Sequence, residues 1–112
     1  METDDDLLSR NIISSVSTDG VVVIVNGAEH LRSWNTVTAA SATTVERGDA
    51  RIFVLAIVFD DARAFVVGEV DAAWSQVVEY FHLCLTGVEP FSAWGPRLLA
   101  RPGVRELFDR EA

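Results

Sequence analysis

The residues best suited to chemistry are a histidine and a cysteine that stand two positions apart, His82 and Cys84. Both fall in a predicted helix over residues 71–85, where this spacing turns the two side chains about 200° away from each other. They therefore do not form a nucleophile and base pair within that helix. We interpret Cys84 as a small buried hydrophobic residue. His82 is interpreted as a solvated residue, with a pH-responsive or catalytic role as the alternative.

Three carboxylates are further candidates. Asp60 and Asp61 stand together in a predicted turn between two apolar strands. Adjacent carboxylates can bind a divalent cation or share a proton, but aspartates in this position more often serve the turn itself. Glu69 interrupts an apolar strand, so it lies either on an exposed face or in a pocket. A buried Glu69 needs a partner, for which Arg51 and Arg63 are candidates.

Tryptophan residues are further candidates, because a tryptophan ring can line a ligand pocket or anchor an interface. Trp74 lies on the predicted buried side of the helix and is interpreted as core. Trp94 stands in a segment rich in glycine, proline and aromatic residues, which forms either an exposed binding lip or part of the core. The candidate ligand-binding or partner-binding residues are thus Glu69, His82, Trp94, Asp60 and Asp61. Two histidines and one thiol do not make a structural zinc site, and we expect no metal or other cofactor.

The strongest structural pattern runs through the middle of the chain. Residues 52–59 are apolar at every position, which predicts a central strand, and residues 64–70 predict a second one after the turn at 60–62. The helix over 71–85 has Asp71 as its predicted N-cap and Gly87 at its C-terminal end. Trp74 and the apolar residues that follow it at helical spacing form one buried face.

The first half of the chain is less clearly patterned. Residues 4–16 predict a short helix, or in part an extended edge segment. The five consecutive β-branched residues 21–25 predict a strand that is buried on both faces or lies at an oligomer seam. A helix is expected to begin near Ala28. Residues 35–46 fit either a helix or a strand, and a strand near 42–46 is preferred because a turn at 47–49 then leads into the next strand.

Two short helices are predicted at the C-terminal end, over residues 91–100 and from Pro102 onward. The expected architecture is a single α+β domain over residues 1–112, with a mostly antiparallel sheet of about four strands, the main helix 71–85 and short C-terminal helices. Residues 1–6 are expected to form a flexible acidic tail. Because several strands are apolar on both faces and few helices cover them, we expect a homodimer.

The net charge of the chain limits the classes of binding partner that we expect. The 112 residues include 17 acidic residues against nine arginines and no lysine, and the net charge is −8. An acidic surface repels phosphate groups, which argues against nucleic-acid and membrane partners and leaves a basic protein as an expected partner. The acidic first residues do not resemble a signal peptide, and no apolar run is long enough to cross a bilayer. We therefore expect a soluble cytoplasmic protein.

One resemblance bears on partner choice. The helix that leads into the sequence Leu-Thr-Gly-Val-Glu-Pro at residues 85–90, followed by Trp94, is similar to the C-terminal part of some bacterial toxin-immunity proteins. This resemblance implies a small acidic inhibitor that covers a basic nuclease site.

The sequence contains no catalytic triad spacing, metal-ligand set, phosphate-binding loop or basic patch. The leading hypothesis is therefore a non-catalytic protein-interaction or binding module. An immunity-type inhibitor is one form that such a module can take. One alternative is a small-ligand-binding protein or enzyme with a pocket between the sheet and helix 71–85. The other is a structural accessory subunit, which would expose apolar surface when isolated.

Overall fold

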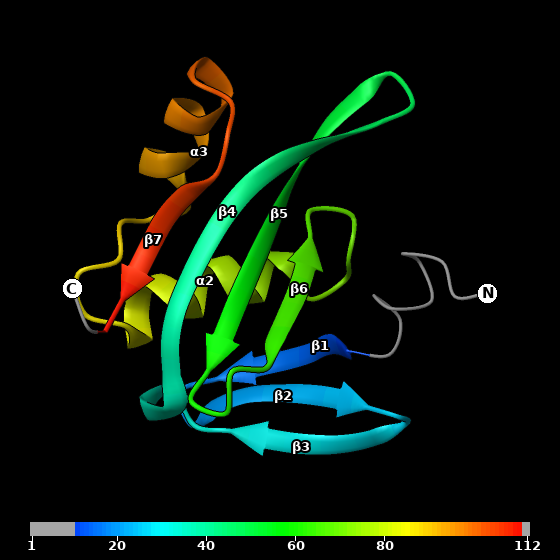
Figure 1. The fold of residues 1–112 in the computed structure, drawn as a ribbon, viewed down its shortest axis with the longest axis vertical. Helices are drawn as coiled ribbons and strands as arrows, with labels where there is room; N and C mark the ends of the chain where they lie inside the picture. The colour runs from blue at the N-terminus through cyan, green and yellow to red at the C-terminus, as the bar shows by residue number, and fades with distance from the viewer. Residues whose placement is uncertain (1–10, 111–112) are drawn as a thin grey trace.

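Seven strands form one mixed sheet, and two helices pack on one of its faces (Figure 1). The computed structural model describes residues 11–110. The strands are β1 (Asn11–Ser17), β2 (Gly20–Val25), β3 (Ala28–Arg32), β4 (Val37–Arg47), β5 (Ala50–Phe59), β6 (Ala64–Gly68) and β7 (Arg105–Asp109). The helices are α2 (Trp74–Cys84) and α3 (Phe91–Ala100), and a single 3-10 turn, η1 (Trp34–Thr36), lies between β3 and β4.

The sheet consists of two antiparallel meanders, β1–β2–β3 and β4–β5–β6, placed edge to edge in the order β3-β2-β1-β6-β5-β4-β7. They meet where β1 runs parallel to β6, and among the described residues Ile12 pairs with Val66 there. β7 returns from α3 to pair antiparallel with the outer edge of β4. The first meander lies crosswise to the second, so the sheet bends sharply at this joint (Figure 1).

Local sequence explains both meanders. β2 is a run of β-branched residues, and the Asn26-Gly27 turn that follows has φ of 51° and 84°. Positive φ at both positions is the geometry of the tightest hairpin turn, which folds β3 back onto β2. β4 and β5 pair along ten positions, from Val37 opposite Phe59 to Arg47 opposite Ala50.

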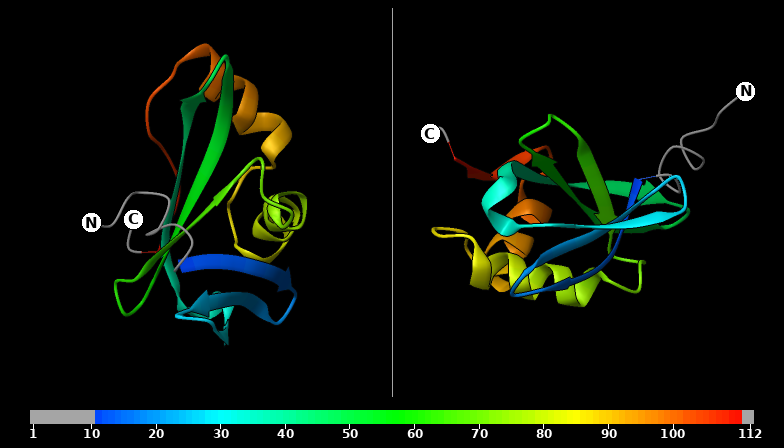
Figure 2. Two further views of the ribbon diagram at one scale, coloured as in Figure 1. Left: turned by 90° about the vertical axis from the view of Figure 1, so that its right-hand side faces the viewer. Right: turned by 90° about the horizontal axis from the view of Figure 1, so that it is seen from below.

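The core lies between the sheet and the two helices, which occupy the same side of β4–β6 (Figure 2). Alternate residues of β5 point into it, and Leu55 and Ile57 are completely buried. An aromatic cluster fills the space under the helices, where the Phe53 ring stacks on Trp74 at 6.5 Å and meets the edges of Phe91 and Trp94. This packing fixes α2 and α3 on one face of the sheet, and within residues 11–110 no helix lies on the other face.

The prediction of a sheet of about four strands is wrong, because the sheet has seven strands and is mixed. The helix expected near Ala28 is strand β3, and the helix expected from Pro102 is replaced by strand β7. Both are edge strands with little buried surface, so they lack the apolar run by which the inner strands were found. Their conformation is set by pairing with β2 and β4.

Other boundaries also differ from expectation. Of the helix predicted over residues 4–16, residues 4–10 lie outside the described part of the chain and the remainder forms β1. The uncertain segment 35–46 is mostly strand β4. The main helix begins at Trp74 with Ala73 at the N-cap, so Asp71 is not the cap. The strand predicted over residues 52–59 and the helix predicted over 91–100 are confirmed.

Candidate docking surface

The face of the sheet opposite the helices is apolar. Cross-strand pairing places Ile12, Val66, Ala56 and Ser41 in one row across β1, β6, β5 and β4. Residues directly opposite each other share a face, and that face alternates along each strand. The same alternation defines the apolar members of this surface, here called the open face: Ile12, Val22, Ile24, Leu31, Ala39, Val45, Ala50, Ile52, Val54, Ala56, Val58, Ala64 and Val66.

The side chains of the open face do not belong to the core. Neighbours on the same strands, such as Leu55 and Val67, are fully buried, whereas Val54 and Val66 are half-buried and lie outside the core cluster. Val45 is 42% exposed and Leu31 60% exposed. A contiguous apolar surface of this kind is uncommon on a monomeric protein and is typical of interaction sites.

Charge on the open face is confined to its rim. Arg47 ends β4, and Glu106 on β7 lies opposite Ser41. Neither makes an ion pair within residues 11–110. Glu29 and Asp109 occupy the outer strands β3 and β7. An apolar centre surrounded by charged side chains is typical of a protein–protein interface.

Glu69 does not point into a pocket. It follows the last residue of β6, in the turn that leads to α2, and its Oε1 accepts a hydrogen bond of 3.2 Å from the backbone N–H of Phe53. Neither Arg51 nor Arg63, the partners considered from sequence, is bound to it; those arginines pair with Glu46 and Asp61. Glu69 therefore extends the β5–β6 pairing by one side-chain contact.

His82 lies in the last turn of α2 and is exposed. Its Nδ1 is 2.7 Å from the carbonyl oxygen of Val88, and since a carbonyl only accepts, Nδ1 donates. Glu69 precedes this helix and His82 stands near its far end, so the two are not brought together. Cys84 is half-buried, and burial raises the pKa of its thiol, which disfavours the reactive thiolate.

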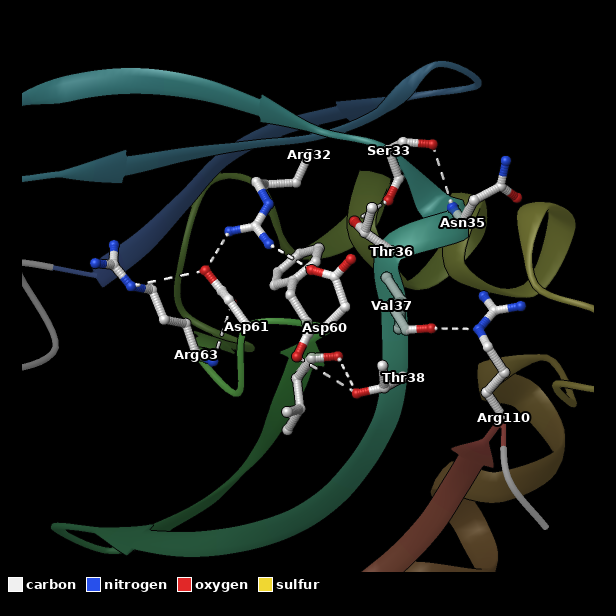
Figure 3. A network of polar contacts seen from close by, with 12 residues as sticks. Arg32, Ser33, Asn35, Thr36, Val37, Thr38, Asp60, Asp61, Arg63 and Arg110 are labelled. Atoms are coloured by element: carbon white, nitrogen blue, oxygen red, sulfur yellow. Dashed lines mark hydrogen bonds and ion pairs between the residues drawn. The ribbon is translucent and has the colours of Figure 1, made fainter.

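Asp60 and Asp61 both form ion pairs with one arginine, Arg32 (Figure 3). Arg32, at the end of β3, donates to Asp61 Oδ2 at 3.2 Å and to Asp60 Oδ1 at 3.3 Å. Its guanidinium also lies 4.6 Å from the centroid of the Phe59 ring. The hydrogen bond from Arg32, aided by the backbone N–H of Arg63, lowers the pKa of Asp61. This contact ties the first meander to the second.

Trp94 is part of the core. It is 2% exposed, and its ring packs 4.8 Å from the ring of Phe91 and 5.9 Å from that of Phe53. Of the two interpretations of its segment, the structure matches core packing.

One cavity, of about 630 Å³, lies between the C-terminal end of α3 and β7, away from the space between sheet and α2. Three arginines line it: Arg97, Arg101 and Arg105. Glu89 pairs with Arg97 at 2.8 Å and with Arg105 at 3.7 Å, so its carboxylate already holds two of the three guanidinium groups.

Sequence reasoning missed the open face as a site because it searched for polar residues with known chemistry. The signal was present in residues 21–25 and 52–59, which are apolar on both sides. What the sequence did not reveal is which parity faces the helices.

Within residues 11–110 no group of three or more His, Cys, Asp or Glu side chains is placed to hold a metal ion. Neither described helix has the length and apolar character needed to cross a membrane. Comparison with known protein families, with curated proteins and with solved structures gave no match.

Proposed function

We propose that this protein is a non-catalytic interaction module whose working surface is the open face. The observation that carries the proposal is the row of half-buried aliphatic side chains that, in the described part of the chain, pack neither in the core cluster nor under α2 or α3. Aliphatic surface left in water is unfavourable by about 25 cal/mol per Å², so covering this face with another protein releases free energy. The five candidate residues from sequence lie outside the open face and are not gathered at one site.

Two neighbouring valines of β6 provide a matched test. Val67 is fully buried, whereas Val66 lies on the open face. Threonine has the shape of valine and is equally suited to a strand, so each substitution changes little except the hydroxyl. If the open face is a docking surface and not part of the core, Val66→Thr lowers the free energy of unfolding by less than about 0.5 kcal/mol. Val67→Thr lowers it by about 1–3 kcal/mol.

Urea unfolding followed by tryptophan fluorescence measures both variants. The measurement is made at low protein concentration, where association adds little to apparent stability. A loss at Val66 as large as the loss at Val67 would show that the open face contributes to folding in its own right and would contradict the proposal.

The alternative of a small-ligand-binding protein is supported by one observation, the cavity beside α3. Its guanidinium groups suit an anionic ligand, but Glu89 occupies two of them. The open face offers a larger uncommitted surface, so the interaction module is preferred.

A further inference from the structure

We infer that the surface covering the open face is a second copy of this chain, related to the first by a two-fold axis that crosses β4 near Thr44. The inference rests on the proposed function and adds to it the identity and orientation of the partner. It is carried by the position of two unpaired charges relative to the apolar centre.

Arg47 and Glu106 both belong to the open face, and they mark two separate points along β4. Glu106 lies beside Ser41 through the β4–β7 pairing, and Arg47 stands six residues further along β4. At about 3.3 Å per residue the two points are roughly 20 Å apart. Each side chain is exposed and makes no ion pair within the described residues.

A two-fold axis between two facing sheets, at right angles to β4 and passing Thr44, reverses the direction of β4. It brings Arg47 of each copy beside Ser41 of the partner subunit and thereby next to Glu106 of the partner subunit. Two packed sheets are about 10 Å apart, a gap that an arginine and a glutamate reaching from opposite sides can close. The rotation therefore forms two ion pairs, each between Arg47 of one copy and Glu106 of the partner subunit.

The same rotation aligns the apolar positions. Val45 falls over Thr43 of the partner subunit, and Ile52 falls over Val54 of the partner subunit, because Ile52 and Val54 lie opposite Val45 and Thr43 in the β4–β5 pairing. The contact centre then contains no charged side chain, as two molecules that each carry a net charge of −8 require for close approach. A basic partner would instead need acidic side chains at this centre, and there are none.

Edge-to-edge pairing is a less suitable way to join two copies. The outer strand β3 carries Glu29, His30 and Arg32, and the outer strand β7 carries Arg105, Glu106 and Asp109. Charged side chains on edge strands are a common protection against strand addition. The open face, whose centre carries no charged side chain, is the surface that remains.

Sedimentation velocity over a range of micromolar concentrations tests the inference on six proteins. The wild type is expected to sediment as a monomer–dimer equilibrium, and Ile52→Lys as a monomer. Arg47→Glu and Glu106→Arg each place like charges together at two points and are expected to raise the dissociation constant about tenfold or more. The double variant Arg47→Glu with Glu106→Arg exchanges the charges and is expected to restore association.

Leu83→Lys is the matched control, since Leu83 is 64% exposed on α2, on the other side of the sheet. It is expected to leave the dimer intact. A wild type that stays monomeric overturns the inference, and so does a dimer that Ile52→Lys and the charge variants leave unchanged. In either case the proposed interaction module still stands if Val66→Thr leaves the free energy of unfolding nearly unchanged. A large loss of stability in Val66→Thr would contradict both the interaction module and the dimer. Should Ile52→Lys not fold, the exposed charge variants give the answer alone.

Discussion

Contacts made by individual side chains help to hold the two meanders together. Within residues 11–110 the backbone pairing of β1 with β6 is limited to Ile12 and Val66, and side-chain contacts also join the two meanders. Arg32 does this from β3 by binding the turn between β5 and β6 (Figure 3). Trp34 does it too, because its ring packs on Phe81 of α2 while its Nε1 donates to the Ser17 carbonyl at 2.7 Å.

The sequence predicted the turn at Asp60 and Asp61 but not its partner. Two adjacent aspartates between two strands favour a turn, and this local sequence pattern can be recognised without tertiary information. Arg32 stands 28 positions before Asp60, and nothing in the intervening residues specifies that contact. An arginine partner was expected for Glu69 only if it were buried; Glu69 is exposed, and its donor is the backbone N–H of Phe53, which no sequence pattern marks.

Asp61 gives a pH-dependent prediction. Its pKa in the folded protein is lowered from the ordinary value of 3.8, chiefly by the hydrogen bond from Arg32. The stabilisation it provides is therefore complete above the unfolded pKa and is lost as pH falls through the folded pKa. We expect the stability difference between wild type and Asp61→Asn to be largest near neutral pH and to vanish in acid.

Urea unfolding over a pH series measures this difference, and an NMR titration follows the Asp61 carboxyl directly. In Arg32→Gln the pKa of Asp61 should rise toward its ordinary value. An Asp61 pKa that does not respond to Arg32→Gln would disprove the role given to this contact.

At the scale of elements, the inner strands β2, β5 and β6 were predictable, whereas the edge strands β3 and β7 were not. β5 is apolar on both parities and buried at alternate positions, so its sequence identifies it without tertiary information. β3 has no buried residue, and its strand conformation comes from its pairing with β2. The Asn26-Gly27 dipeptide was the available signal, because it specifies a hairpin rather than the end of a strand.

β1 was obscured for a different reason. A bulge between Ile13 and Ser15 breaks the regular alternation with β2, so its apolar residues do not follow the two-residue period of a strand. The open face was accessible to prediction only in part. An oligomer seam was one interpretation of residues 21–25, but the side occupied by the helices depends on α2 and α3 packing on the aromatic cluster.

Gly20 is where the first meander depends on glycine. It begins β2 at φ +153°, and a Cβ at this position would lie 2.2 Å from the carbonyl oxygen of Arg32. Gly20→Ala is expected to lower the free energy of unfolding by more than about 2 kcal/mol, because both the backbone conformation and the contact become strained. The measurement is urea unfolding followed by circular dichroism.

Gly68→Ala is the control, since a Cβ there meets Asp71 at an ordinary 3.6 Å. It should change stability by no more than about 1 kcal/mol. Equal losses in the two variants would refute the steric explanation for Gly20.

For the molecule as a whole, the one-sided placement of the helices has the largest consequence. Both helices cover the same side of β4–β6 (Figure 2), and the aliphatic residues of the other side form the surface on which we propose that a partner binds. A net charge of −8 opposes self-association through a charged surface. The open face avoids that opposition, because its charges lie at the rim and are arranged to pair under a two-fold rotation.

Isotope-filtered NMR on a mixture of labelled and unlabelled chains tests the central claim most directly, because it detects only contacts between copies. The methyl groups of Ile52 and Val54 are predicted to give intermolecular NOEs to methyl groups of the partner subunit. The exposed methyl groups of Leu83 on α2 should give none. Intermolecular NOEs that come from the helix side, or their absence from Ile52 and Val54 in an associated sample, would contradict the assignment of the open face as the contact between copies.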